Sequence, residues 1–342
     1  MIAVRRAPYD PLIGAWLLAV CAMLVAMILI GGATRLTDSG LSITEWQPIG
    51  GAIPPLSGLD WDVLFAKYRA TPQYRLETHG MSLAEFKFIF WWEWSHRFLG
   101  RAIGVVFALP FVLFALAGRL KGRFWRCLLL FALGGLQGAI GWWMVDSGLH
   151  GNMVVVSPVR LAIHLGLAFF ILAFAWRMAL GAFTWPRGPG LTGTPGWLGW
   201  TFIVLLYVQI LAGALMAGSG AGRAYSDWPR IGGEWLPSSY ASLTPIWRNF
   251  YENHATIQFD HRTLGYVLAA IATMMGAGAG LYGQGSAGRL AVLLFIAALA
   301  QAGLGIHAVT SGAPLDISLT HQAGAIVLWL IAHAAMRANA MR

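Results

Sequence analysis

Long apolar runs separated by polar connections make up most of this chain. Runs long enough to cross about 30 Å of hydrocarbon, which takes roughly 20 helical residues, fall near residues 12–34, 97–118, 124–145, 159–180, 197–218, 262–282, 288–309 and 317–336. The pattern predicts an all-α polytopic membrane protein with eight transmembrane helices. The first run exceeds the apolar core of a secretory signal and ends without a convincing cleavage site, so we interpret it as a retained helix.

Composition and charge support a membrane topology. With 58% hydrophobic and 11% charged residues and a mean hydropathy of +0.64, the chain is not an ordinary soluble globule. Basic residues gather in alternate connections, which places those connections and both termini in the cytoplasm and the two long loops, about 35–95 and 219–260, on the outer face. The net charge of +9 follows from this topology and does not indicate a nucleic acid partner. The basic residues are Arg5, Arg6, Arg119, Lys121, Arg123, Arg126, Arg187, Arg289, Arg337 and Arg342.

The chain contains an internal repeat of two matching halves. Each half holds four predicted spans and so returns to the side where it began, which makes the repeats parallel, related by an axis near the membrane normal. We therefore predict two parallel-repeat four-helix bundles, one in residues 1–185 and one in residues 186–342. The matching positions are Gly31, Gly40, Glu45, Trp46, Gly50 and Gly51 with Gly213, Gly222, Asp227, Trp228, Gly232 and Gly233, and Gln137, Gly141, Val145, Ser147 and Gly148 with Gln301, Gly305, Val309, Ser311 and Gly312.

Four histidines are the candidate metal ligands of this chain. Residues 96–100 (HRFLG) and 261–265 (HRTLG) are nearly identical and open the second and sixth apolar runs, while His164 and His321 enter the fourth and eighth. A lone membrane histidine is most often a packing residue, but the second and fourth helices of a four-helix bundle can face each other across its core. We predict that His96 with His164, and His261 with His321, are axial ligands of two haem irons. Zinc fits less well, because no histidine or cysteine cluster has zinc-ligand spacing.

Three charged residues lie beside these histidines. Arg97 and Arg262 each follow a predicted ligand and can bind haem propionates, or alternatively anchor the chain at the membrane surface. Glu93 lies three residues before His96, whereas the matching position before His261 is Gln258. A carboxylate beside only one haem suggests that one site reacts and the other relays electrons. The alternative role for Glu93 is to stabilise a helix N-terminus.

With these motifs in place, the chain resembles the haem A synthase family. The resemblance rests on residues 31–42 (GGATRLTDSGLS), Glu45-Trp46 with Pro48, residues 85–87 (EFK) and 93–97 (EWSHR), His164, His261-Arg262 and residues 320–322 (THQ). It implies eight spans, substrate haem O and product haem A at His96 and His164, a haem b at His261 and His321, and Glu93 as the essential carboxylate. Some members of the family carry a pair of cysteines in the first outer loop, but residues 35–95 here contain no cysteine. In this respect the chain resembles the proteobacterial branch of the family.

The expected function is oxidation of a peripheral methyl of haem O to the formyl group of haem A through hydroxylated intermediates, in cytochrome oxidase biogenesis. Two histidine ligands leave no iron position for oxygen, which favours water as the oxygen source. Expected partners are haem O synthase, cytochrome oxidase assembly factors, an unidentified electron acceptor and the lipid bilayer of a bacterial plasma membrane. One alternative is a two-haem b-type electron carrier such as a quinol oxidoreductase, and another is a transporter or assembly factor, supported only by the repeat.

Overall fold

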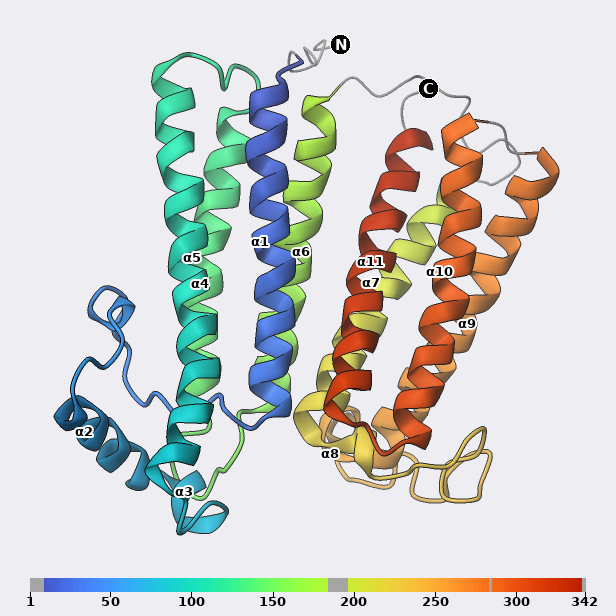
Figure 1. Ribbon diagram of the computed structural model, residues 1–342. Helices are drawn as coiled ribbons and strands as arrows, with labels where there is room; N and C mark the ends of the chain where they lie inside the picture. The colour runs from blue at the N-terminus through green and yellow to red at the C-terminus, as the bar shows by residue number, and fades with distance from the viewer. Residues whose placement is uncertain (1–8, 184–195, 283–284, 340–342) are drawn as a thin grey trace. The chain divides into compact units, whose positions relative to one another are not determined.

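The computed structural model describes residues 9–183, 196–282 and 285–339 (Figure 1). Within these ranges the regular structure is helical, apart from one isolated bridge between Ile231 and Glu234. The chain divides into two compact units, residues 1–183 and 184–342. The predicted all-α class is therefore confirmed.

Each unit contains four long helices. Those of the first unit are α1 (Pro11–Leu36), α4 (Leu83–Leu116), α5 (Phe124–Asp146) and α6 (Pro158–Ala182). Those of the second are α7 (Gly196–Ser219), α9 (His254–Tyr282), α10 (Gly285–Thr310) and α11 (Leu315–Asn339). Over the described residues, seven of these helices are long and apolar enough to cross a membrane. The remaining long helix, α9, is not among these seven over the described residues.

The helices of each unit pack as a four-membered ring. In the first unit, α1 and α5 each pack against both α4 and α6. In the second, α7 and α10 each pack against both α9 and α11. The second and fourth long helices therefore lie at opposite corners of each bundle, and side chains from both can enter the same core.

The second helix of each unit begins earlier than hydropathy predicts. α4 starts at Leu83 instead of near residue 97, and α9 starts at His254 instead of near residue 262. A capping box starts α4, because Ser82 accepts from the Glu85 N–H and Glu85 accepts from the Ser82 N–H. His96 and His261 consequently lie inside long helices and not at their first turns.

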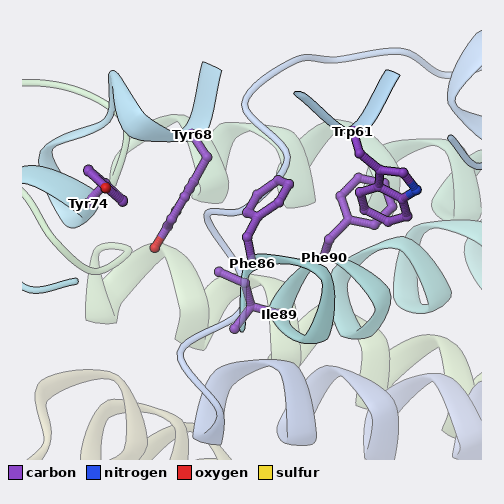
Figure 2. Close-up of a cluster of buried hydrophobic side chains, with 6 residues drawn as sticks. All are labelled: Trp61, Tyr68, Tyr74, Phe86, Ile89 and Phe90. Atoms are coloured by element: carbon purple, nitrogen blue, oxygen red, sulfur yellow. The ribbon is translucent and has the colours of Figure 1, made fainter. Parts of the chain in front are cut away.

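The first long loop folds into a small helical subdomain. Its helices α2 (Gly58–Arg69) and α3 (Pro72–Leu76) pack with the first turns of α4 around a buried, mainly aromatic cluster (Figure 2). Gln73 ties this subdomain to the end of α1, because its amide donates to the backbone carbonyl of Asp38 at 3.1 Å. The cluster thus supports the segment of α4 that precedes Glu93 and His96. Its members are Trp61, Tyr68, Tyr74, Phe86, Ile89 and Phe90.

The second long loop contains less helix than the first, but hydrogen bonds also hold it to the bundle. It contains the 3-10 turns η2 (Ala221–Arg223) and η3 (Ile246–Arg248) and the single-turn helix α8 (Asn249–Glu252). Asn253 ends the loop and caps α9, since its side-chain oxygen accepts from the N–H groups of Ala255 and Thr256 at 3.0 and 3.2 Å. This cap fixes where α9 begins.

Candidate active site

In the first unit, each predicted ligand ring packs against a glycine of a neighbouring helix. A Cβ built on Gly31 of α1 would lie 3.0 Å from Nε2 of His96 on α4. A Cβ built on Gly141 of α5 would lie 2.8 Å from Cε1 of His164 on α6. Any larger residue would displace these rings, so the two glycines hold space for the histidines.

The second unit repeats this arrangement. A Cβ on Gly213 of α7 would lie 3.2 Å from Cε1 of His261 on α9, and one on Gly305 of α10 would lie 3.0 Å from Cε1 of His321 on α11. These glycines occupy the positions that match Gly31 and Gly141 in the sequence repeat. The duplication therefore extends to the immediate surroundings of all four histidines.

The structure brings the histidines together in the predicted pairs. His96 and His164 come from opposite corners of the first bundle and lie within electrostatic range of each other. His261 and His321 have the same relation in the second bundle. Each unit thus presents two imidazoles to one core.

Two glutamines at matched positions contact the histidines of the fourth helices. The side-chain amide of Gln137 donates to the backbone carbonyl of His164 at 3.0 Å and lies 3.2 Å from its Nδ1. The amide of Gln301 donates to the carbonyl of His321 at 2.9 Å and lies 3.1 Å from its Nδ1. Sequence reasoning found these glutamines as repeat positions and gave them no role, although a polar residue recurring within an apolar span was the available signal.

A third glutamine was missed altogether. The amide of Gln209 on α7 donates to the backbone carbonyl of His261 at 3.0 Å and lies 3.4 Å from its Nε2. The signal for it was a single amide side chain in the otherwise apolar fifth run. Three of the four histidines therefore have a glutamine beside the ring.

Glu93 is the centre of a buried polar network in the first unit. Its side chain is 3% exposed, and Oε1 accepts from Nε and Nη2 of Arg97 at 3.0 and 2.6 Å. Oε2 accepts from the Ser42 hydroxyl at 2.7 Å and from the Ile43 N–H at 2.8 Å. Because α4 begins at Leu83, Glu93 lies well inside the helix, and the alternative of an N-terminal role is wrong.

Arg97 extends this network to the outer loop. Its Nη2 donates to the carbonyl of Ile43 at 2.7 Å, and its Nη1 donates to the carbonyl of Glu45 at 2.9 Å. The ion pair of Glu93 and Arg97 thus fastens the loop to α4 one turn from His96. The predicted binding of a haem propionate by Arg97 stays a prediction.

The second unit has the same network with an amide in place of the carboxylate. Oε1 of Gln258 accepts from Nη2 of Arg262 at 2.8 Å, and its Nε2 donates to the carbonyls of Ala221 and Tyr225 at 2.9 and 3.0 Å. Arg262 also donates to the carbonyl of Asp227 at 2.8 Å, as Arg97 does to that of Glu45. The arginine contacts of the two networks match, whereas Glu93 accepts from Ser42 and Ile43 at the place where Gln258 donates to two carbonyls. The networks therefore differ in charge and in hydrogen-bond direction. The predicted propionate contact of Arg262 likewise stays a prediction.

The donor set suits haem better than a bare metal ion. Nδ1 of His261 is buried without a hydrogen-bond partner, as expected of a ring whose polar contacts are incomplete without a ligand. Among the described residues, no group of three or more His, Cys, Asp or Glu side chains could hold a metal ion. Two imidazoles in each core would supply the two protein ligands that a porphyrin-bound iron can take.

The close contact between Gly305 and the His321 ring predicts that adding one methyl group at Gly305 will lower haem binding. We expect Gly305→Ala to displace the His321 ring and to lower the haem content of the purified protein, measured as pyridine haemochrome per chain. Gly303→Ala in the same helix is the control, because a Cβ there would have nothing within 4 Å. Equal haem content in the two variants would contradict the assignment of Gly305.

Fold and site together define a class: a multi-pass α-helical membrane protein with a half-buried histidine pair in each of two repeated bundles. Residues 14–333 match the sequence profile described as "Cytochrome oxidase assembly protein". The chain is 48% identical to the "Heme A synthase" of Dinoroseobacter shibae, with 95% of this chain and 86% of that protein covered. It is 47% identical to that of Rhodopseudomonas palustris strain TIE-1 (93% and 86% covered) and 48% identical to that of Paracoccus denitrificans (92% and 84% covered).

The chain therefore belongs to the haem A synthase family, the oxidoreductases that convert haem O to haem A for cytochrome oxidase assembly. This membership confirms the family resemblance drawn from the motifs.

Proposed function

We propose that this chain converts haem O to haem A in its first unit and holds a haem b in its second. The observation that carries this division is the pairing of Glu93 with Arg97 in one unit against Gln258 with Arg262 in the other. Both units have the histidine pair and the facing glycines, whereas a carboxylate occurs at this position only in the first. A charge present beside one of two otherwise matched sites supports reaction at that site.

The histidines are proposed to bind the two haems by their irons. His96 and His164 bind the substrate haem O, and His261 and His321 bind haem b. Haem b supplies one-electron redox chemistry when it is bound. Gln209 and Gln301 contact the haem b ligands, and Gln137 contacts one ligand of the substrate, so these amides orient the imidazoles.

Glu93 is proposed to stabilise positive charge as electrons leave the substrate ring, with water as the oxygen source. Its carboxylate already accepts two hydrogen bonds at each oxygen. Such a preorganised group can oppose developing charge without rearranging. This geometry supports charge stabilisation over transfer of a proton to Glu93, because a proton there would displace an existing donor.

We further propose eight membrane spans, with α9 as the sixth, in a bacterial inner membrane. Within the first unit, the Asp10 N–H donates to the carbonyl of Ala182, and Asp10 pairs with Arg119 at 2.9 Å. The hydrogen bond from Arg119 holds the pKa of Asp10 below its usual value. The basic residues near this end make it cytoplasmic. Glu93 and His96, beside the long loop, then lie toward the outer face.

The proposal is tested by extracting haems from cells that make haem O, with and without this chain, and analysing them by chromatography with mass spectrometry. We expect haem A or its hydroxylated precursor only when the chain is expressed. Haems B and O alone, together with a bis-histidine b-type spectrum of the purified protein, would support the two-haem electron carrier instead. The electron acceptor, haem O synthase and assembly factors remain expected partners.

A further inference from the structure

The charge of Arg97 is already balanced by the carboxylate beside it. Its Nε and Nη2 both donate to Oε1 of Glu93. Its Nη1 and Nη2 donate to the loop carbonyls of Glu45 and Ile43. All three nitrogens of Arg97 therefore have partners, and its pair with Glu93 has no net charge to offer a second anion.

Arg101 lies one turn beyond Arg97 on α4, and its charge is not balanced. Nε donates to the carbonyl of Pro48 at 2.8 Å, and Nη2 donates to that of Gln47 at 2.7 Å, both of them uncharged groups. Within residues 9–183, 196–282 and 285–339, Arg101 forms no ion pair. Its Nη1 is buried without a hydrogen-bond partner. A buried cationic donor in this state has incomplete polar contacts.

The position of Arg101 brings it near the first histidine site. Residues four apart on a helix share a face, and helical side chains lean toward the N-terminus of the helix. Arg101 therefore reaches back along α4 toward Arg97, which follows His96 directly, and the two guanidinium groups lie within electrostatic range. A Cβ on Gly51 would lie 2.7 Å from Nη2 of Arg101. The loop thus holds the edge formed by Nε and Nη2 and leaves Nη1 available.

The second unit has one arginine in a comparable state. The residue beside Arg262 is the neutral Gln258, and among the described residues Arg262 forms no ion pair. Its Nε is buried without a hydrogen-bond partner. Asp227 lies within electrostatic range, but its carboxylate accepts from two backbone N–H groups of the loop. Arg262 therefore has a donor to offer an anion, as Arg101 does.

Tyr266 occupies the position of Arg101 in the second unit. Residues 96–101 (HRFLGR) match residues 261–266 (HRTLGY). The Tyr266 hydroxyl accepts from Nε1 of Trp228 at 2.9 Å, so this position makes an uncharged contact with the loop there. The second arginine occurs in the unit where a glutamate neutralises the first.

We propose that Arg101 binds a propionate carboxylate of the substrate haem. Glu93 balances the charge of Arg97, and Arg101 supplies the cation that this pairing removes. Guanidinium N–H donors match the geometry of a carboxylate, and a carboxylate that leaves water needs such a partner. In the second unit, where the neighbouring residue is neutral, Arg262 can make this contact itself. The inference rests on the proposed haem site of the first unit.

The test compares haem O with its dimethyl ester, in which both propionates are neutral. Full-length His321→Ala protein, which retains the first site, is titrated with each compound, and binding is followed through the low-spin spectrum. We expect haem O to bind about tenfold or more tightly than the ester, because esterification removes a hydrogen bond between charged groups. In Arg101→Gln made in this protein, haem O should bind about as weakly as the ester, whose own affinity should not change.

The ester separates anion binding from a structural role of Arg101. If its bonds to Gln47 and Pro48 served only to hold the loop, Arg101→Gln would weaken both compounds equally, which would contradict the proposal. Lys87→Gln is the matched control, because it removes one positive charge from α4 at a place where the ammonium lies over the Trp61 ring. It should keep the full preference for haem O. Equal loss of the preference in both variants would refute a specific contact with Arg101.

The remaining outcomes separate this inference from the proposed function. If the His321→Ala protein binds haem O with a bis-histidine spectrum and Arg101→Gln keeps the preference over the ester, the inference is refuted and the proposed function stands. Loss of co-purified phospholipid from that variant, with the preference unchanged, would assign Arg101 to a lipid phosphate and refute the inference as well. If the His321→Ala protein binds no haem O while the parent chain binds haem, the ligand pair of the first site is wrong. The proposed function then falls together with this inference.

Discussion

Replacing His321 with alanine is expected to remove the haem of the second unit and to suppress conversion of haem O. His321 comes from α11, lies within electrostatic range of His261 on α9, and packs against Gly305. Without it, the iron would lose one axial ligand, and its remaining support would be His261. We expect one of two haems to be lost from the purified protein, with conversion reduced at least about tenfold.

The measurement combines haem content per chain, the low-spin spectrum and conversion of haem O in membranes. His307→Ala is the matched control, because His307 is exposed on α10 and lies outside the predicted pairs. That variant should keep both haems. Unchanged haem content in His321→Ala would remove His321 from the ligand set, whereas loss of haem in both variants would indicate general damage to the bundle.

The helical class and the pairing of the histidines could be predicted because both follow from periodic features of the sequence. Inside a membrane, backbone N–H and C=O groups must form their hydrogen bonds within the protein. Continuous apolar runs of about 20 residues meet this requirement as helices. The repeat then placed His96 and His261 on second helices, and His164 and His321 on fourth helices. Packing as a ring of four brings those helices to opposite corners. Hydropathy and repetition were sufficient for this part of the site.

The starts of α4 and α9 could not be predicted from hydropathy, because polar and aromatic residues there are stabilised by loops and not by lipid. Phe86, for example, is buried among the aromatic residues of α2 and α3. The capping box of Ser82 and Glu85 was a local signal for the true start of α4. The start near residue 97 was predicted from the length of the apolar run alone, without using that signal.

The partners of Glu93 were also out of reach, because they come from distant parts of the chain. Ser42 and Ile43 are some fifty positions away in sequence, and only the folded loop brings them to Glu93. The same holds for Gln209 and His261, whose contact joins α7 to α9. Spacing rules detect neighbours on one helix, so contacts between helices appear only when the bundle is assembled.

Glu93→Gln is expected to abolish most conversion while leaving the fold and haem binding intact. The second unit supports this separation, because Gln258 occupies the matching position and still accepts a hydrogen bond from its arginine at 2.8 Å. Arg97 would keep its bonds to the carbonyls of Ile43 and Glu45. What the variant loses is the negative charge one turn from His96, together with an acceptor for the Ile43 N–H, because the amide nitrogen that replaces Oε2 only donates. Losses of preorganised electrostatic stabilisation of this kind are about 100-fold or more in rate.

The measurement is the rate of conversion of haem O in membranes, set against haem content and the bis-histidine spectrum of the same preparation. Glu85→Gln makes the same change of charge on the same helix at an exposed position, where glutamine can still complete the capping box. It should convert haem O at the parent rate. Full conversion by Glu93→Gln with normal haem content would mean that the carboxylate serves only to fasten the loop, a role that an amide fills in the second unit. The difference between the two units would then have to lie in the axial ligands and their neighbours.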